Sequence, residues 1–263
     1  MKISFIKISP TQNVTVLVTT PVPRAQQPSV AAELLAYDGV GGEQVGFLEP
    51  PTLDGALCRL QMMGGEFCGN ATMSVAAYIA WKEGLADGGS FNYPLEVSGA
   101  QELVVCRIER TGDVFRGTVS MPLPERISEI TLDTDAGPQT FPMVVMPGIT
   151  HLISASGMCR SEIERRIRSW NASIRADALG VLSFDEASRS IEPLVYVPST
   201  NSVVWERGCG SGSAALGSWK ASVEGGFSGA VRQPGGEIIV NAHDEFLTIT
   251  GCVRIVAEGT AYI

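Results

Sequence analysis

A short motif occurs twice in this chain, and its repetition is the strongest constraint on how the chain can fold. Cys68 is followed by Gly-Asn and by small apolar residues with helical spacing, in EFCGNATMSVAAYIAWKEG. Cys209 lies 141 positions later (209 − 68), and RGCGSGSAALGSWKASV again places small residues after it. Strand-like segments precede and follow both motifs. The order of strands, Cys-Gly motif, helix and strands therefore occurs twice, although the letters differ.

Turn residues indicate how the chain is divided. The 263 residues suit one large domain or two modest ones, and 29 glycines and 15 prolines predict many short strands. Pro122 and Pro124 lie between the two motifs, in MPLPER, and suggest a hinge between two halves. Short helices are predicted over 29–37, capped by Ser29, and over 161–170.

Composition excludes several classes of partner. The net charge of −9 argues against nucleic acid, because phosphate binding needs a basic face. No uncharged apolar run approaches roughly 18 residues, so no membrane span is expected. The first residues, MKISFIKISP, do not resemble a signal peptide, so a cytoplasmic protein with reduced thiols is expected. The six cysteines form no CxxC pair or Cys/His cluster, so no metal site is predicted.

A cysteine and a glycine at the start of a helix have a definite chemistry. The glycine lets a ligand approach the backbone, and the first amides of a helix have no acceptor within it. The helix dipole is positive at this end, so each motif is a candidate carboxylate site. The same field is expected to lower the pKa of each thiol from about 8.5 toward neutrality.

Two such motifs acting on one amino acid predict racemisation. One thiolate would remove the α-proton while the other thiol supplies a proton to the opposite face. The helix amides would stabilise the enediolate-like charge on the carboxylate. This two-base scheme requires no cofactor.

Other interpretations of these residues stay open. Each motif alone also fits a small core cysteine at a tight strand–helix turn. A single nucleophilic cysteine paired with a histidine is another enzymatic option, and the chain has His151 and His243. His151 fits an orienting role or a core or surface position, whereas His243 lies in a polar turn and receives no role. A non-enzymatic amino-acid binding protein would leave the second thiol without a purpose.

At these motifs the sequence resembles the diaminopimelate epimerase family, which carries Cys-Gly-Asn in its first half and Cys-Gly-Ser-Gly in its second. More closely, it is similar to the histidine racemase branch, which serves staphylopine-type metallophore synthesis. The segments that carry this resemblance span nearly the whole chain: EQVGF at 43–47, EFCGNATMS at 66–74, VSG at 97–99, FDE at 184–186, PLVYVP at 193–198, VVWE and CGSGS within 203–213, QPGG at 233–236 and AYI at 261–263.

The resemblance implies an α+β fold of two pseudo-symmetric halves, each a curled, mostly antiparallel sheet around a central helix. The halves would be 1–122 and 123–251, with a last strand at about 252–263 returning to the first half and the site in the cleft between them. It also implies a homodimer, a small-molecule amino-acid substrate and no pyridoxal phosphate.

The resemblance also assigns site residues. Cys68 and Cys209 would be the catalytic pair. The substrate-binding residues would be Gly69, Asn70, Gly210 and Ser211, which hold the α-carboxylate through backbone amides, together with Asn13 and Gln44.

Departures from diaminopimelate epimerases indicate a different side chain on the substrate. The asparagine that precedes their first cysteine motif has no match in LQMMGGEF, and their Asn-Pro-His motif is replaced by Ile-Thr-His, which ends at His151. Glu43 is the candidate reader of an imidazole, because a carboxylate accepts a hydrogen bond from its N–H. Glu206 is a candidate for the substrate ammonium or for pairing with Arg207, which itself suggests an acidic substrate.

The remaining cysteines and tryptophans are interpreted as structural. These residues are Cys58, Cys106, Cys159, Cys252, Trp205 and Trp219. The resulting hypothesis is a cofactor-independent amino-acid racemase, most simply of histidine. The alternatives are a racemase or epimerase of another amino acid such as diaminopimelate, or a same-fold isomerase of the phenazine or methylaconitate type, which would not need both cysteines.

Overall fold

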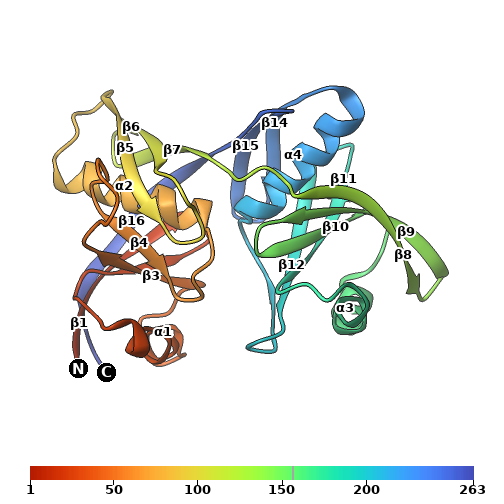
Figure 1. Ribbon diagram of the computed structural model, residues 1–263, viewed down its shortest axis with the longest axis horizontal. Coiled ribbons are helices and arrows are strands. Elements are labelled where there is room, and N and C mark those ends of the chain that lie inside the picture. Colours follow the sequence, from red (N-terminus) through yellow and green to blue (C-terminus); the bar gives the residue numbers. More distant parts are fainter. Residues whose placement is uncertain (156) are drawn as a thin grey trace. The chain divides into compact units, whose positions relative to one another are not determined.

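The computed structural model describes residues 1–155 and 157–263. Its contacts divide the chain into two compact units: unit 1 comprises Met1–Ser120 and Thr250–Ile263, and unit 2 comprises Met121–Ile249. The sequence-based division placed the two boundaries after 122 and 251, two residues later in each case. Both chain ends belong to unit 1, where they lie side by side (Figure 1).

Unit 1 contains seven complete strands and most of an eighth. The strands are β1 (Lys2–Pro10), β2 (Thr15–Val18), β3 (Gln44–Glu49), β4 (Arg59–Met62), β5 (Ser90–Val97), β6 (Val104–Thr111) and β7 (Val114–Ser120), and the helices are η1 (Arg24–Gln26), α1 (Gln27–Leu35) and α2 (Gly69–Lys82). The last strand, β16 (Phe246–Tyr262), begins in unit 2 and pairs antiparallel with β1 in unit 1.

Unit 2 has the same kinds of element. Its strands are β8 (Arg126–Thr134), β9 (Gly137–Met146), β10 (Ile149–Ala155), β11 (Leu179–Asp185), β12 (Ser190–Val197), β13 (Ser202–Trp205), β14 (Phe227–Gln233) and β15 (Gly236–His243), and its helices are α3 (Arg160–Ile174) and α4 (Gly210–Glu224).

Strand pairing repeats from one unit to the other. From β1 to β6, successive pairs are antiparallel, parallel, antiparallel, parallel and antiparallel. The same series runs through β9, β10, β11, β12, β14 and β15. α1 and α3 occupy equivalent places in this order, as do α2 and α4. The prediction of an α+β fold with two halves of one plan is confirmed.

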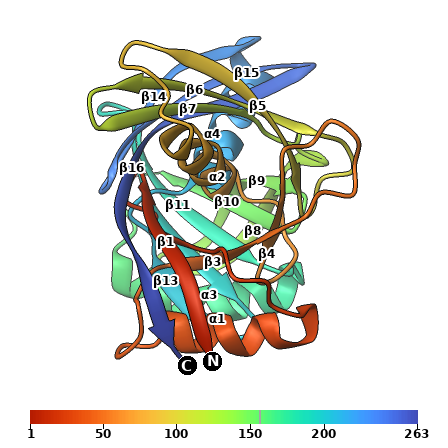
Figure 2. The same ribbon diagram turned by 90° about the vertical axis from the view of Figure 1, so that its left-hand side faces the viewer.

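The two helices that follow the cysteines are central because small side chains surround them. All residues from Gly69 to Ala77 are buried, and a helix that is apolar or small on every side belongs in a protein interior. The strands of unit 1 curve around α2 (Figure 2). α4 is buried in the same way among strands of unit 2, including β14 and β15.

The other pair of helices is amphipathic and covers the opposite faces of the sheets. α1 packs Val30, Ala31 and Leu34 into a core cluster with β1, β2 and β3. α3 packs Ile163 and Ile167 into the corresponding cluster of unit 2. The predicted cap of α1 is wrong: Ser29 lies inside the first turn, where its hydroxyl donates to the Gln26 carbonyl, because the helix already begins at Gln27.

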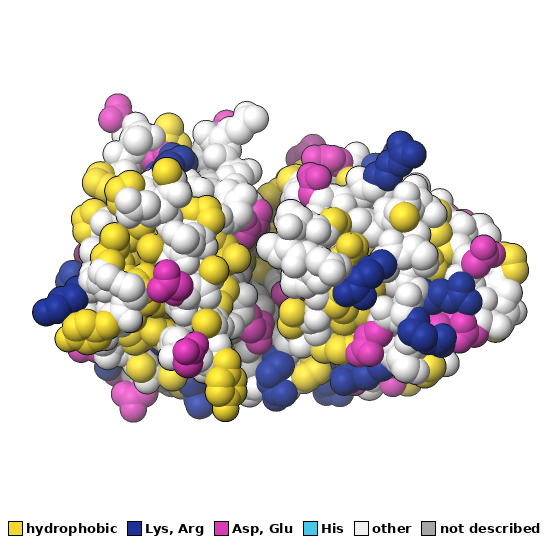
Figure 3. Space-filling model, turned by 90° about the horizontal axis from the view of Figure 1, so that it is seen from below, with side chains coloured by type: hydrophobic (Ala, Val, Ile, Leu, Met, Phe, Trp, Pro, Cys, Tyr) yellow, Lys and Arg dark blue, Asp and Glu magenta, His cyan; other side chains and the backbone are white. Residues whose placement is uncertain are grey.

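The structure also gives the lengths of the helices and the distribution of charge on one face. In 1–155 and 157–263, no helix is long and apolar enough to cross a membrane. On the face in Figure 3, Lys and Arg side chains are interspersed with Asp and Glu and form no continuous basic area. This pattern fits a chain with a net charge of −9.

Candidate functional site

Cys68 is the N-cap residue of α2. Its backbone is extended (φ −137°, ψ 109°), and its Sγ accepts a hydrogen bond from the Ala71 N–H at 3.4 Å. Its carbonyl accepts from the N–H and hydroxyl of Thr72, at 2.9 and 2.8 Å. The thiol thus occupies the position that a Ser or Asp oxygen takes in ordinary N-caps. The half-buried sulfur is therefore held at the positive end of the helix.

A chain of hydrogen bonds leads from Cys68 through three of the predicted substrate-binding residues. The Cys68 thiol donates to Gln44 Oε1 at 3.2 Å. Gln44 Nε2 donates to Asn13 Oδ1 at 2.7 Å and to Thr15 Oγ1 at 2.8 Å. Asn13 Nδ2 in turn donates to Glu43 Oε2 at 2.6 Å. Because both acceptors face Gln44 Nε2, the amide oxygen is directed at the sulfur. The structure therefore brings Asn13, Glu43 and Gln44 together with Cys68.

Gly69 and Asn70 form the buried first turn of α2. Their backbone N–H groups belong to the helix end, where no intrahelical acceptor exists. The Asn70 carbonyl accepts the Ser74 hydroxyl at 2.9 Å. Both residues directly follow the N-cap sulfur, at the start of α2.

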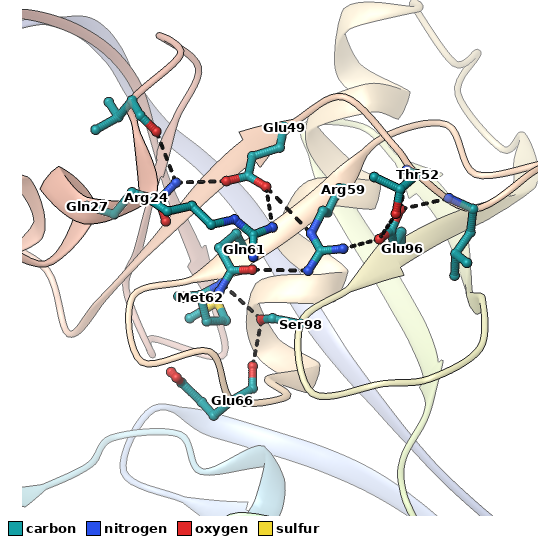
Figure 4. A network of polar contacts seen from close by, with 12 residues as sticks. Arg24, Gln27, Glu49, Thr52, Arg59, Gln61, Met62, Glu66, Glu96 and Ser98 are labelled. Atoms are coloured by element: carbon teal, nitrogen blue, oxygen red, sulfur yellow. Dashed lines mark hydrogen bonds and ion pairs between the residues drawn. The ribbon is translucent and has the colours of Figure 1, made fainter.

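Strands β4 and β5 hold the loop that leads into Cys68 (Figure 4). Ser98 Oγ accepts from the Met62 N–H at 3.0 Å and donates to the Glu66 carbonyl at 2.8 Å. Beside it, Arg59 forms ion pairs with Glu49 and Glu96. The structure shows the VSG segment to be a support for the first motif.

Glu96 is a buried carboxylate beside this support. Burial alone would raise its pKa, but hydrogen bonds from Thr52 and the Leu53 N–H, together with Arg59, lower the pKa of Glu96 to about 2. The carboxylate therefore stays charged in its buried position and fixes the 52–53 loop to β5.

Cys209 repeats the N-cap geometry on α4. Its backbone is extended (φ −104°, ψ 106°), and its Sγ accepts from the Gly212 N–H at 3.3 Å. Its carbonyl accepts from the Ser213 N–H at 3.1 Å and the Ser213 hydroxyl at 2.8 Å. A Cβ on Gly212 would lie 2.8 Å from Leu182 Cδ2 and 3.1 Å from Cys209 Sγ, so a side chain there would crowd both Leu182 and the sulfur.

The surroundings of Cys209 overturn one expectation. Burial, and then the Glu206 carboxyl to which the thiol donates, raise the pKa of Cys209 well above its usual range. The prediction that the helix field lowers the thiol pKa is wrong for Cys209, because only 2% of the residue is exposed and a carboxyl lies beside it. Desolvation also raises the pKa of Glu206, whose carboxyl accepts the hydrogen bond from the Cys209 thiol.

His151 and Ser211 extend the polar contacts of Cys209. Ser211 Oγ lies 3.5 Å from Cys209 Sγ and 3.1 Å from His151 Nε2. His151 is fully buried, and burial lowers its pKa to about 3, so the ring is neutral. The ring packs on the Gly180 backbone, where a Cβ would lie 2.2 Å from Nδ1. Sequence reasoning left His151 open between an orienting and a core role, and the structure gives it a contact with Ser211.

Three other residues discussed from the sequence contact backbone or hydrophobic side chains. Arg207 is exposed and its Nη2 donates to the Pro234 carbonyl at 3.2 Å. His243 stacks on Phe246 at the surface. Trp205 packs against the core of unit 2. Among the described residues, no group of three or more His, Cys, Asp and Glu is arranged to hold a metal ion.

The remaining cysteines divide into two kinds. Cys106 is buried and Cys58 is half-buried, as expected of structural residues. Cys159 and Cys252 are exposed, so the prediction that they pack structurally is not supported by their position.

Comparisons with known proteins place the chain among amino-acid racemases. The family model described as "Histidine racemase CntK N-terminal domain" matches residues 2–262. A histidine racemase of Staphylococcus aureus is 32% identical over 99% of this chain and 98% of its own length, and one of Fusobacterium nucleatum is 30% identical over 99% and 97%. A crystal structure of a hydroxyproline epimerase from Agrobacterium vitis has a TM-score of 0.72 at 14% identity and covers 99% of this chain and 91% of that one. A predicted epimerase from Pseudomonas aeruginosa has a TM-score of 0.70 at 14% identity, with 97% and 98% covered.

Proposed function

We propose that this chain, which belongs to the histidine racemase family, interconverts L- and D-histidine without a cofactor by transferring the α-proton between two thiols. One observation carries the proposal: two topologically equivalent helices, α2 and α4, each begin at a cysteine N-cap. Such a pair supplies two proton-transfer groups of the same type and two sets of helix amides for one carboxylate.

The amides that would hold the carboxylate can be identified in α4. The N–H groups of Gly212 and Ser213 are engaged by Cys209 itself. The N–H groups of Gly210 and Ser211 have no acceptor among the described residues and belong to the helix end. In α2, Cys68 likewise engages the two later amides. We assign carboxylate binding to Gly69 and Asn70 in α2 and to Gly210 and Ser211 in α4.

The proton transfer balances without a co-reactant. The base, as thiolate, takes the α-proton, and the electron pair of the C–H bond passes into the carboxylate as an enediolate. The other thiol delivers its proton to the opposite face of the α-carbon and becomes the thiolate. Because burial and Glu206 raise the pKa of Cys209, we assign this thiol as the proton donor for the enantiomer whose α-proton faces Cys68, and the two roles exchange for the opposite enantiomer.

Recognition of the imidazole is assigned to Glu43. The Asn13 amide donates to Glu43 Oε2 at 2.6 Å and so fixes the carboxylate near Cys68. A fixed carboxylate accepts an imidazole N–H and favours the imidazolium form. Glu206 is assigned to the substrate ammonium, since its carboxyl lies beside the second sulfur.

The resemblance supports three further proposals. The protein would act as a homodimer, in the cytoplasm, on a free amino acid that supplies metallophore synthesis. Light scattering during size-exclusion chromatography measures the mass of the assembly, and a mass of one 27.9 kDa chain would contradict the dimer.

The activity is tested with purified protein in D₂O without added cofactor. A panel of L-amino acids that includes histidine and LL-diaminopimelate is followed by NMR for loss of the α-proton signal, with chiral chromatography alongside. Loss of the signal with histidine and appearance of D-histidine is the expected result. Exchange with a different amino acid would move the substrate and keep the chemistry, whereas no exchange with any would reject the racemase.

A further inference from the structure

Gln233 holds the peptide backbone of Cys209 from a neighbouring strand. It is the last residue of β14, it is 8% exposed, and neither charge nor substrate chemistry marks it in the sequence. Its Oε1 accepts the Cys209 N–H at 2.6 Å, and its Nε2 donates to Ser213 Oγ at 2.7 Å. The Ser213 hydroxyl then donates to the Cys209 carbonyl at 2.8 Å.

These contacts form a closed ring of hydrogen bonds. The ring passes from the Cys209 N–H through the Gln233 amide and the Ser213 hydroxyl to the Cys209 carbonyl. Both peptide groups of Cys209 are therefore fixed, and with them the backbone angles that direct Cβ and Sγ. A single orientation of the Gln233 amide satisfies both partners, because the Cys209 N–H only donates and the Ser213 hydroxyl has already donated.

The turn after Gln233 also forms hydrogen bonds to the backbone beside Cys209. The Gly235 N–H donates to the Arg207 carbonyl at 2.6 Å, and Arg207 Nη2 donates to the Pro234 carbonyl. The QPGG segment thus binds the backbone just before Cys209 as well as Cys209 itself. Such rigid support matters because catalytic groups must be held within fractions of an ångström of their working positions.

The other unit has a support at the equivalent place. Ser98 directly follows β5, the strand that corresponds to β14, and also makes two hydrogen bonds to backbone near its cysteine. The two side chains differ, but each comes from the end of the strand that follows a cysteine helix. Equivalent placement in both halves is the pattern expected of a requirement of the site rather than of one loop.

We propose that Gln233 is a positioning residue that fixes Cys209 for proton transfer, with Ser98 as its counterpart for Cys68. The proposal rests on the proposed racemase function for its kinetic consequence and on geometry alone for its effect on the sulfur. It assigns to the QPGG segment a role in holding the site without touching the substrate.

The test compares Gln233→Ala with Asn171→Ala. Asn171 is a matched control: it is a buried side-chain amide of unit 2 with two hydrogen bonds to the Ala176 backbone, both 3.2 Å, and no contact with Cys209. In Gln233→Ala, kcat is expected to fall by about 10- to 100-fold while KM changes by less than about threefold, since a misplaced group loses mainly transition-state stabilisation. Asn171→Ala is expected to keep kcat within about twofold.

A second readout follows the sulfur itself. Alkylation by iodoacetamide, resolved for each cysteine by peptide mass spectrometry, is measured without substrate. In Gln233→Ala, loss of the hydrogen bond to the Cys209 backbone is expected to raise the alkylation rate of Cys209 at least about fivefold. The alkylation rate of Cys68 is expected to stay within about twofold of wild type. If wild-type protein racemises nothing, the proposed function fails, but this alkylation comparison still decides the role of Gln233.

Ser213→Ala opens the same ring from its other side and is the variant to use if Gln233→Ala does not fold. It is expected to give the same direction of change in kcat and in Cys209 alkylation, and the double variant to be no worse than about the more severe single one. Unchanged kcat and alkylation in folded Gln233→Ala or folded Ser213→Ala would overturn the proposal. So would losses equal to those of Asn171→Ala.

Discussion

The two cysteine N-caps share a backbone geometry but not a chemical environment. Cys68 is half-buried and donates to the neutral amide of Gln44. Cys209 is almost fully buried, and its thiol donates to the Glu206 carboxyl. A carboxylate beside a thiol opposes the thiolate by its negative charge, and a neutral amide carries no such charge. Equivalent positions in the fold therefore do not make equivalent bases.

The difference arises because the repeat preserves strand order and not side chains. Gln44 begins β3 and pairs with Thr15 of β2. The equivalent start of β11 is Leu179, which pairs with Thr150. Where unit 1 places an amide that reaches its sulfur, unit 2 places an apolar core residue, and the groups beside its sulfur are Glu206 and Ser211. The two halves thus specialise while they keep one topology.

The largest expected effect comes from removing either sulfur. Cys68→Ser and Cys209→Ser are each expected to lower racemisation by about 10³-fold or more, because a hydroxyl is a far weaker base and acid partner at neutral pH. Chiral chromatography of the product measures the rate, and circular dichroism checks folding. Cys106→Ser, a buried cysteine outside both motifs, is the control. More than about a tenth of the activity remaining in either variant would contradict the two-base scheme.

A change at Glu206 sharpens the contrast between the sulfurs. Glu206→Gln removes the charge that raises the pKa of Cys209, so the alkylation profile of Cys209 is expected to shift to lower pH while that of Cys68 stays in place. If Glu206 also holds the substrate ammonium, kcat/KM is expected to fall by about 10²-fold. Glu162→Gln, at a buried carboxylate of unit 2 that accepts from the Asp135 N–H, is the control. An unmoved profile would show that Glu206 does not set the Cys209 pKa.

The preference for histidine over other amino acids tests the role of Glu43, which is linked to Cys68 by hydrogen bonds through Asn13 and Gln44. Glu43→Gln is expected to lower kcat/KM for histidine by about 10- to 100-fold, the loss that follows from one hydrogen bond to a charged group. Glu49→Gln changes a carboxylate at the far end of β3, paired with Arg24 and Arg59, and is expected to leave kcat/KM within about twofold. Competition between histidine and other amino acids in one assay gives the preference directly. An unchanged preference in Glu43→Gln would move side-chain recognition elsewhere.

Much of this site follows from the sequence because helix starts have local signals. The cysteine, the glycine after it and the small residues that follow all lie within one turn or two, so α2 and α4 could be placed from spacing. The resemblance added Asn13 and Gln44, which are distant in sequence from Cys68. Gln44 contacts the Cys68 thiol directly, and Asn13 is linked to it through Gln44. The cap of α1 was missed because Pro28, in its first turn, fits a start that precedes Ser29.

Residues whose role depends on burial could not be placed in the same way. The sequence does not reveal that Cys209 is enclosed, so the helix field was given more weight than desolvation. Gln233 lies 24 positions from Cys209 and meets it only because β14 ends beside the start of α4. A polar residue directly before Pro-Gly-Gly at a strand end is the signal that could have drawn attention to it.

The smallest expected effect concerns His151, a fully buried histidine near Cys209. Unit 1, which holds Cys68, contains no histidine. Burial lowers the pKa of His151 in the folded protein to about 3, from about 6.5 when unfolded. Between these values the unfolded state binds more protons, so the His151 contribution to stability is complete above about pH 6.5 and is lost as pH falls toward 3. His151→Gln is expected to flatten this part of the curve of unfolding free energy against pH, measured by urea unfolding, while His243→Gln, at an exposed histidine, keeps the wild-type slope.

The pH–rate profile of His151→Gln is expected to match wild type from about pH 5 to 8, because a neutral ring does not titrate there. A limb near pH 6 that disappears with His151 would instead show that this ring ionises in the working enzyme and shares in the acid–base chemistry of Cys209.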